Sequence, residues 1–125
     1  MSRNLALKSL NSAGTPGQAE RRLEILFSKN PRLNERDRAF AVHLVQGVLR
    51  WRIRLDWILK QYVRFPFRKI DPPVLNILRL ALFQILFLDR VPESAAVNEA
   101  VKQTQKMGKN HVAKFVNGIL RQICR

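Results

Sequence analysis

The sequence predicts an all-α protein, a single compact bundle of six to seven helices around a central apolar helix. Apolar residues recur at three- and four-residue steps through most of the chain, whereas the alternation typical of a half-buried strand is nearly absent. Proline, glycine and capping residues separate these segments. The 125 residues suit one domain, which can bury roughly two-thirds of the unfolded chain's surface. No internal repeat or second-domain linker is visible.

Two helices are predicted in the first part of the chain. The first runs from about Arg3 to Asn11, and its apolar side comprises Ala6, Leu7 and Leu10. After the break "SAGTPGQ", Thr15, Pro16 and Gln18 form a capping-box start for a second helix that ends near Lys29. Its inward stripe comprises Ala19, Leu23, Leu26 and Phe27.

Asn34 can cap a third helix, with Asp37 in its first turn. Its inward stripe comprises Phe40, Ala41, Leu44, Gly47, Val48 and Trp51. Gly47 costs helix propensity there, so we expect another helix to cross closely at this point. "RWRIRLDWILKQYV" continues as a bent helix or a helix pair. Its stripe comprises Trp51, Leu55, Ile58, Leu59 and Tyr62, and Trp57 falls outside it.

The most apolar segment predicts the central helix. Asp71 is placed to cap it, Pro72 suits its first position, and it continues through Leu88. The apolar run is shorter than the ~20 residues that a membrane-spanning helix requires. It also contains three polar residues, Asn76, Arg79 and Gln84. We therefore predict a buried core helix and no membrane span.

A helix-to-helix corner follows at Pro92, which biases Val91 away from α geometry and suits the first position of a new helix. Glu93 then lies near the positive end of the helix dipole. The apolar face comprises Ala96, Val97, Ala100, Val101 and Met107. Gly108 is predicted to end this helix in a left-handed conformation, and Asn110 to cap the last one. The last helix buries Val112, Phe115, Val116, Ile119, Leu120 and Ile123.

The charge balance points to an anionic partner. With 23 Lys and Arg against 9 Asp and Glu, the formal net charge is +14. Nucleic acid is the leading interpretation, and solubility, an acidic protein or an anionic membrane are the alternatives.

Cys124 is the only cysteine, which excludes an internal disulfide and a cysteine zinc site and fits a reducing cytoplasm. The first residues have too short an apolar run to predict a secretory signal.

No catalytic or metal-binding residues are predicted. The chain has no glycine-rich phosphate loop, no zinc-protease motif and no strand framework for a dinucleotide or adenosyl cofactor. The acidic residues are scattered and are interpreted as caps and helix-surface charges. His43, on the flank of its stripe, is interpreted as a packed or surface residue.

Basic surfaces supply the candidate binding residues. Lys114, Arg121 and Arg125 share the polar face of the last helix with Gly118, which leaves room for a phosphate to approach the backbone. The alternative is that Gly118 relieves helix packing.

A second candidate lies earlier in the chain, where Arg50, Arg54 and Trp57 follow at four- and three-residue steps, so that the indole could stack a base. The simpler interpretation is that Trp57 packs against a neighbouring helix. Asn98 and Asn117 lie at the edges of their apolar stripes. We expect them to be structural polar residues that hydrogen-bond a neighbouring backbone, in preference to contacting RNA.

Four segments in order, "ERDRAFAVHLVQGVLRW", "RLDWIL", "ILRLALFQILFLDRVPESAAVNEAV" and "KFVNGILRQI", resemble the NusB-like helical domain over nearly the whole chain. One branch of that family is the free-standing antitermination factor, which joins a ribosomal protein on a boxA RNA leader. The other is the N-terminal domain of Sun/Fmu (RsmB) enzymes, which methylate the 5-carbon of a cytosine in small-subunit ribosomal RNA. "GVLRWRIRLDWIL" and "ILRQICR" look more like the methyltransferase branch.

The resemblance implies an RNA-binding domain, with small-subunit ribosomal RNA as the leading target. Both branches suggest RNA contact near the first helix, where Arg3 and Lys8 are the candidates, although the dense arginine cluster of the antitermination branch is missing. In the methyltransferase branch, S-adenosylmethionine and two catalytic cysteines belong to a following α/β domain, and Cys124 matches no such motif. The partners implied are RNA, a C-terminal methyltransferase domain or a ribosomal protein. A protein-docking domain and a homodimer remain as alternatives.

Overall fold

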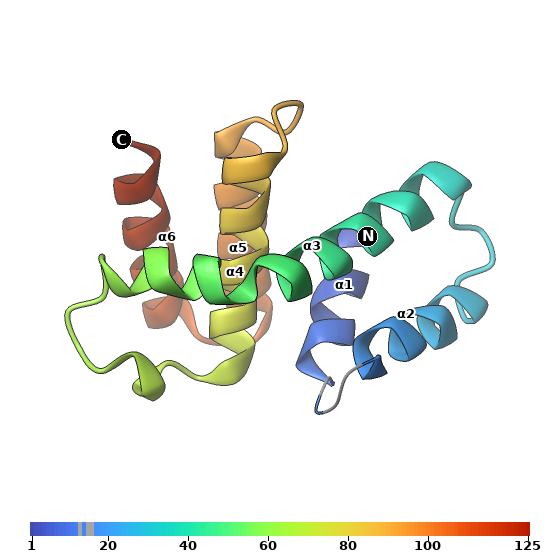
Figure 1. The fold of residues 1–125 in the computed structure, drawn as a ribbon, viewed down its shortest axis with the longest axis horizontal. Coiled ribbons are helices and arrows are strands. Elements are labelled where there is room, and N and C mark those ends of the chain that lie inside the picture. Colours follow the sequence, from blue (N-terminus) through green and yellow to red (C-terminus); the bar gives the residue numbers. More distant parts are fainter. Residues whose placement is uncertain (13, 15–16) are drawn as a thin grey trace.

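The computed structural model describes residues 1–12, 14 and 17–125, and within these ranges it contains helices and no strand (Figure 1). The elements are α1 (Ser2–Asn11), α2 (Gln18–Ser28), α3 (Glu35–Lys60), the short 3-10 helix η1 (Phe67–Lys69), α4 (Pro72–Phe87), α5 (Glu93–Lys106) and α6 (Asn110–Cys124). The predicted all-α bundle of six to seven helices is confirmed. The capping box at Thr15 and Pro16 lies outside the described residues.

Helix α3 connects two groups of helices (Figure 1). Its first half packs with α1 and α2, and the chain then crosses α4, which packs with α5 and α6. The sequence left open a bent helix or a helix pair, and the structure has one α-helix from Glu35 to Lys60. The Asn34 side chain accepts a hydrogen bond from the Asp37 backbone N–H at 2.8 Å, which confirms the predicted cap.

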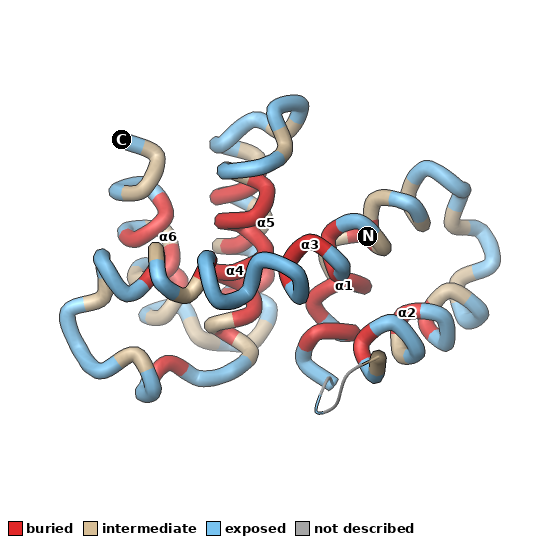
Figure 2. Tube along the Cα trace, viewed as in Figure 1, coloured by how far each residue is buried: buried red, intermediate tan, exposed pale blue. Residues whose placement is uncertain are grey.

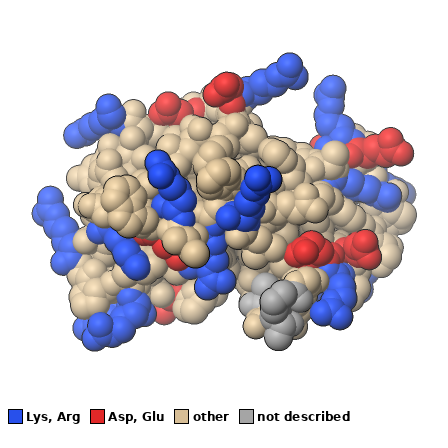
Figure 3. Space-filling model, in the orientation of Figure 1, with Lys and Arg blue, Asp and Glu red and all other residues tan. Residues whose placement is uncertain are grey.

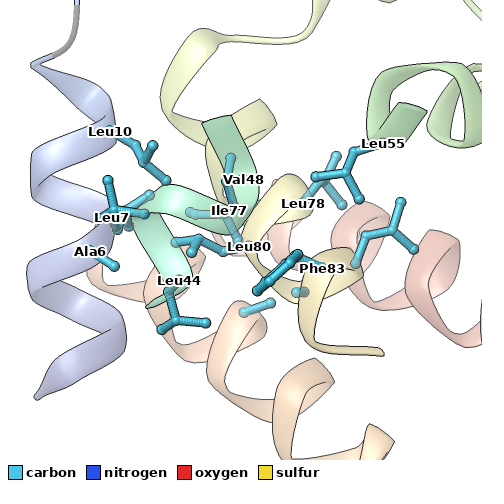
Figure 4. Packing of buried hydrophobic residues seen from close by; sticks show 14 of the residues in the cluster. Ala6, Leu7, Leu10, Leu44, Val48, Leu55, Ile77, Leu78, Leu80 and Phe83 are labelled. Atoms are coloured by element: carbon cyan, nitrogen blue, oxygen red, sulfur yellow. The ribbon is translucent and has the colours of Figure 1, made fainter. Parts of the chain in front are cut away.

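Helix α4 is the predicted central helix, and it contacts α1, α3, α5 and α6. From residue 74 to residue 84 every side chain is buried except the half-buried Leu75 (Figure 2). Figure 4 shows Leu44 and Val48 of α3 lying against this helix, with α1 alongside. A helix that is apolar on all sides is stable only where neighbours cover each side, and the bundle provides them.

The crossing of α3 over α4 explains the buried glycine. A Cβ atom built on Gly47 would collide with the ring of Phe83, which lies directly over the α3 backbone (Figure 4 shows the ring). Phe83 is 3% exposed. The predicted close crossing at Gly47 is therefore confirmed, because only a residue without a side chain leaves room for this ring.

The polar residues of α4 are satisfied by neighbouring helices. Arg79 donates from Nε to Asp56 Oδ1 at 2.7 Å and from Nη2 to Asp56 Oδ2 at 2.8 Å. Its Nη1 reaches Asn76 Oδ1 at 3.0 Å, and Asn76 donates to Asn11 Oδ1 at 2.9 Å. This chain of contacts ties α3, α4 and α1 together. Asp56 had been interpreted as a helix-surface charge or a cap, and that interpretation is wrong, because its carboxylate is the partner of a buried guanidinium.

Several helix ends differ from the predictions, either in position by one residue or in the hydrogen bond that the capping side chain makes. The Asp71 side chain makes no capping bond and instead accepts a hydrogen bond from Lys109 Nζ at 2.7 Å. Pro92 and Lys109 are the N-cap residues of α5 and α6, so Pro92 lies one position before its predicted place and Asn110 one position after. Gly108 has φ +74°, as predicted for the end of α5.

Candidate nucleic-acid interface

Lys and Arg side chains project over the whole of the face shown in Figure 3, while acidic side chains are fewer and lie mainly toward its upper edge and right side. This face includes the outer side of α3, which runs across the front of the bundle (Figures 1 and 3). The excess of cations favours a polyanionic ligand, because each phosphate that a cation neutralises releases counterions.

The outer side of α3 carries an exposed aromatic and basic surface, which we call the α3 platform (Arg50, Trp51, Ile53, Arg54 and Trp57). These residues line a shallow depression of about 410 Å³. Trp57 is 60% exposed and Ile53 is 88% exposed. The interpretation that Trp57 packs against a neighbouring helix is therefore wrong. The structure brings Arg50, Arg54 and Trp57 together as the spacing predicted.

Trp51 joins the platform although its spacing placed it on the inward stripe, and that prediction is wrong, since the residue is 38% exposed. Its ring stacks on Phe87 with centroids 4.9 Å apart, and Phe87 stacks on Phe83 at 5.4 Å. Arg50 Cζ lies 5.7 Å from the Trp51 ring centroid. The indole is thus held in place by a row of aromatic rings that reaches the core. Tyr62, also expected to face inward, is 36% exposed.

A second surface, the α6 face (Lys114, Gly118, Arg121 and Arg125), is exposed along its length. A Cβ atom built on Gly118 would meet no side chain and no other helix within 4 Å. Gly118 is therefore not needed to let another helix pack closely against α6. Lys114 and Gly118 also line a hollow of about 340 Å³ beside Tyr62 and Phe65. The α6 face thus combines cations, open backbone and neighbouring aromatic rings.

The two asparagines do not make the predicted contacts across helices. Asn117 accepts a hydrogen bond from Arg121 Nε at 3.0 Å, within α6 itself. Asn98 is exposed, and its side chain makes no hydrogen bond to any residue in the described part of the chain. Both line a groove of about 560 Å³ between α5 and α6, together with Lys102 and Lys114. The structural role expected for Asn98 and Asn117 is wrong, because the edge of each apolar stripe faces this groove and not a backbone.

The two candidates in α1 have different surroundings. Lys8 is exposed. Arg3 donates from Nε to the buried Gln84 Oε1 at 2.7 Å, and its Cζ lies 5.5 Å from the Phe40 ring centroid. Arg3 therefore contributes to the contact of α1 with α3 and α4, and less of its guanidinium is available for a ligand than the sequence suggested.

The Cys124 thiol lies at the end of α6, close to Glu93 at the start of α5. Burial raises the pKa of the thiol to about 11, with the hydrogen bond and the negative charge of Glu93 as further causes, while Arg121 acts in the opposite direction. A higher pKa lowers the thiolate fraction but makes each thiolate more nucleophilic, so we expect alkylation by iodoacetamide at pH 8 to be roughly tenfold slower than for an unperturbed cysteine.

Glu93→Gln should accelerate this alkylation, since it removes the negative charge that disfavours the thiolate. A rate equal to that of free cysteine would show that the thiol is not held beside Glu93.

Within the described residues, no three or more His, Cys, Asp or Glu side chains gather as a metal site. No described helix combines the length and apolarity needed to cross a bilayer.

Sequence patterns could not reveal which part of the α3 stripe is covered. Trp51 lies on the predicted stripe and is nevertheless exposed, with its ring against Phe87 at the end of α4. The only sequence signal for the platform was the spacing of Arg50, Arg54 and Trp57. The contact of Phe65 with Phe115, with ring centroids 5.4 Å apart, is a tertiary feature that no local pattern indicated.

Fold and surfaces together define a small basic helical-bundle domain with exposed aromatic rings among its cations. The chain belongs to the NusB family, whose model matches residues 1–125. This confirms the resemblance found in the four segments of the sequence.

Relatives from both branches are similar to this chain. The probable ribosomal RNA small subunit methyltransferase B of Bacillus subtilis is 39% identical over 97 residues, which cover 78% of this chain and 22% of that protein. The transcription antitermination protein NusB of Desulfotalea psychrophila is 36% identical over 110 residues, covering 87% of this chain and 77% of that protein. The chain thus spans about a fifth of the methyltransferase and most of the antitermination protein.

Solved structures share the fold. A chain in a crystal structure of the antitermination factors NusB and NusE in complex with dsRNA has a TM-score of 0.85 and 21% identity, covering 98% of this chain and 92% of that one. A chain in the crystal structure of a plectonemic RNA supercoil has a TM-score of 0.87, also at 21% identity.

Proposed function

We propose that this protein is an RNA-binding module of the NusB type and that it acts in transcription antitermination. The observation that carries the proposal is the similarity to an antitermination protein across 77% of that protein's length. The net charge of +14 and the exposed cations of α3 and α6 support RNA as the ligand. The module works in the cytoplasm, by binding and not by catalysis.

A second candidate is the N-terminal RNA-recognition domain of a small-subunit ribosomal RNA cytosine-5 methyltransferase. The identities of 39% and 40% to two such enzymes favour it, and so do the segments that resemble this branch. S-adenosylmethionine and the catalytic cysteines would then belong to a separate domain. Both candidates bind RNA, and they differ in the RNA that is preferred.

The experiment that separates them measures affinity for a boxA RNA, a small-subunit ribosomal RNA hairpin and an unrelated RNA of equal length, at two salt concentrations. Preference for boxA supports antitermination, and preference for the hairpin supports the methyltransferase domain. Equal, salt-sensitive binding to all three would place specificity in a partner. Absence of RNA binding at moderate salt would contradict both candidates and favour a protein-docking domain.

The α6 face gives a quantitative prediction. Replacing Lys114 and Arg121 by alanine should weaken RNA binding and reduce the slope of log affinity against log salt by about 1.4, since each lost phosphate contact on a single strand removes about 0.7. The measurement is a salt titration of affinity by fluorescence anisotropy.

The matched control replaces Arg21 and Lys29, two exposed cations of the α2 region, by alanine. The two double variants lose the same charge, so an equal effect of both would show that net charge alone matters and would exclude the α6 face as a specific contact.

A further inference from the structure

We propose that the α3 platform is a stacking site for unpaired bases of single-stranded RNA, with Arg50 and Arg54 binding the flanking phosphates. The proposal rests on RNA binding, the proposed function, and adds the site and the strandedness of the ligand. It begins from Trp57, whose large indole is 60% exposed on an ordered helix where no neighbouring element covers it.

The geometry suits a base. Trp57 and Ile53 lie on adjacent turns of α3, and the depression of about 410 Å³ between the platform residues is open and shallow. Trp51 is already stacked on Phe87, so one indole is fixed while the other has a free face. Stacking on an aromatic ring accepts any base and is worth about 1–3 kcal/mol per base. A duplex keeps its base faces covered, so this site selects unpaired nucleotides.

The arginines of the platform disfavour a positively charged ligand and favour phosphate. Arg50 and Arg54 line the depression beside the two indoles. Asp56, the one carboxylate between Gly47 and Lys60, is held by Arg79 through two hydrogen bonds and is absent from the lining of the depression. The pair with Arg79 thus keeps negative charge off the platform.

The test uses the intact chain, a short polyuridine strand and a hairpin duplex of equal charge. Trp57→Ala should weaken polyuridine binding roughly tenfold, change duplex binding little, and leave the salt slope unaltered, since no charge is lost. Trp57→Phe should restore most of the affinity. Ile25→Ala, at an exposed apolar residue of α2 that is 48% exposed, is the matched control and should have no effect.

Fluorescence gives a second readout. The chain has two tryptophans, so Trp51→Phe leaves Trp57 as the only indole, and polyuridine should quench its emission. If the wild-type chain binds no RNA, the proposed function fails together with this inference. If the wild type binds polyuridine but Trp57→Ala binds it equally well, only the stacking site is excluded. A variant with unchanged RNA affinity and reduced self-association would assign the platform to a protein contact and overturn the proposal.

Discussion

Replacing Asp56 by alanine is expected to lower the free energy of unfolding by about 3–5 kcal/mol. The side chain of Arg79 is 9% exposed and that of Asp56 is 18% exposed, so the variant leaves a guanidinium charge in the bundle without its carboxylate. Asn76, the remaining side-chain partner of Arg79, supplies one neutral acceptor at 3.0 Å. Urea denaturation followed by circular dichroism at neutral pH measures the loss.

The control for this prediction is the double variant Asp56→Leu with Arg79→Met. Replacing both members of a buried pair by apolar residues of similar size is often neutral or stabilising, so this variant should recover most of the stability. A loss below about 1 kcal/mol for Asp56→Ala would show that Arg79 reaches water without moving the helices. In that case the pair would not be a fixed connection between α3 and α4.

Gly47→Ala should destabilise the protein by about 1–3 kcal/mol, because the added methyl group overlaps the Phe83 ring and the core must shift to admit it. The same change at Gly118, in open space on α6, is the matched control. There alanine should stabilise by roughly 0.5–1 kcal/mol through helix propensity alone. Thermal and urea unfolding of the two variants give the comparison.

Gly47→Ala and Gly118→Ala are expected to change the free energy of unfolding in opposite directions. If both stabilise, α3 and α4 do not cross as closely as the Phe83 contact indicates. Because Phe83 stacks on Phe87, and Phe87 on Trp51, a shift of Phe83 should also change the near-ultraviolet circular dichroism of the indole. Gly118→Ala should leave that signal unaltered.

Periodicity predicted most of the fold because the helices around α4 each have one side to bury. The stripe Leu44, Gly47 and Val48 is buried as expected, and the continuous apolar run of α4 correctly indicated a helix covered on all sides. The spacing of apolar residues does not show where a neighbouring helix ends. Trp51 and Tyr62 were therefore predicted to be buried although both are exposed. Asp71 shows a similar limit, since capping position alone could not reveal that its side chain is paired with Lys109.

The candidate site was predicted in part. The spacing of Arg50, Arg54 and Trp57 correctly placed them on one helix face, because three- and four-residue steps are a property of the helix itself. Whether that face was open depended on α4 and its neighbours, and the packed alternative for Trp57 was preferred. Arg3 was predicted as a candidate RNA contact, and local pattern could not show its pairing with Gln84, which lies 81 positions further along the chain.

Local spacing and composition were enough to predict the helical class, the order of the helices, the central apolar helix and the strong positive charge. Which polar groups pair and which aromatic rings meet solvent depends instead on how the helices pack. Asp56 with Arg79, and Arg3 with Gln84, join residues on different helices, so their pairing depends on how the helices cross. The α3 platform exists for the same reason: α4 packs against one side of α3, and Trp57 remains exposed beside Arg50 and Arg54.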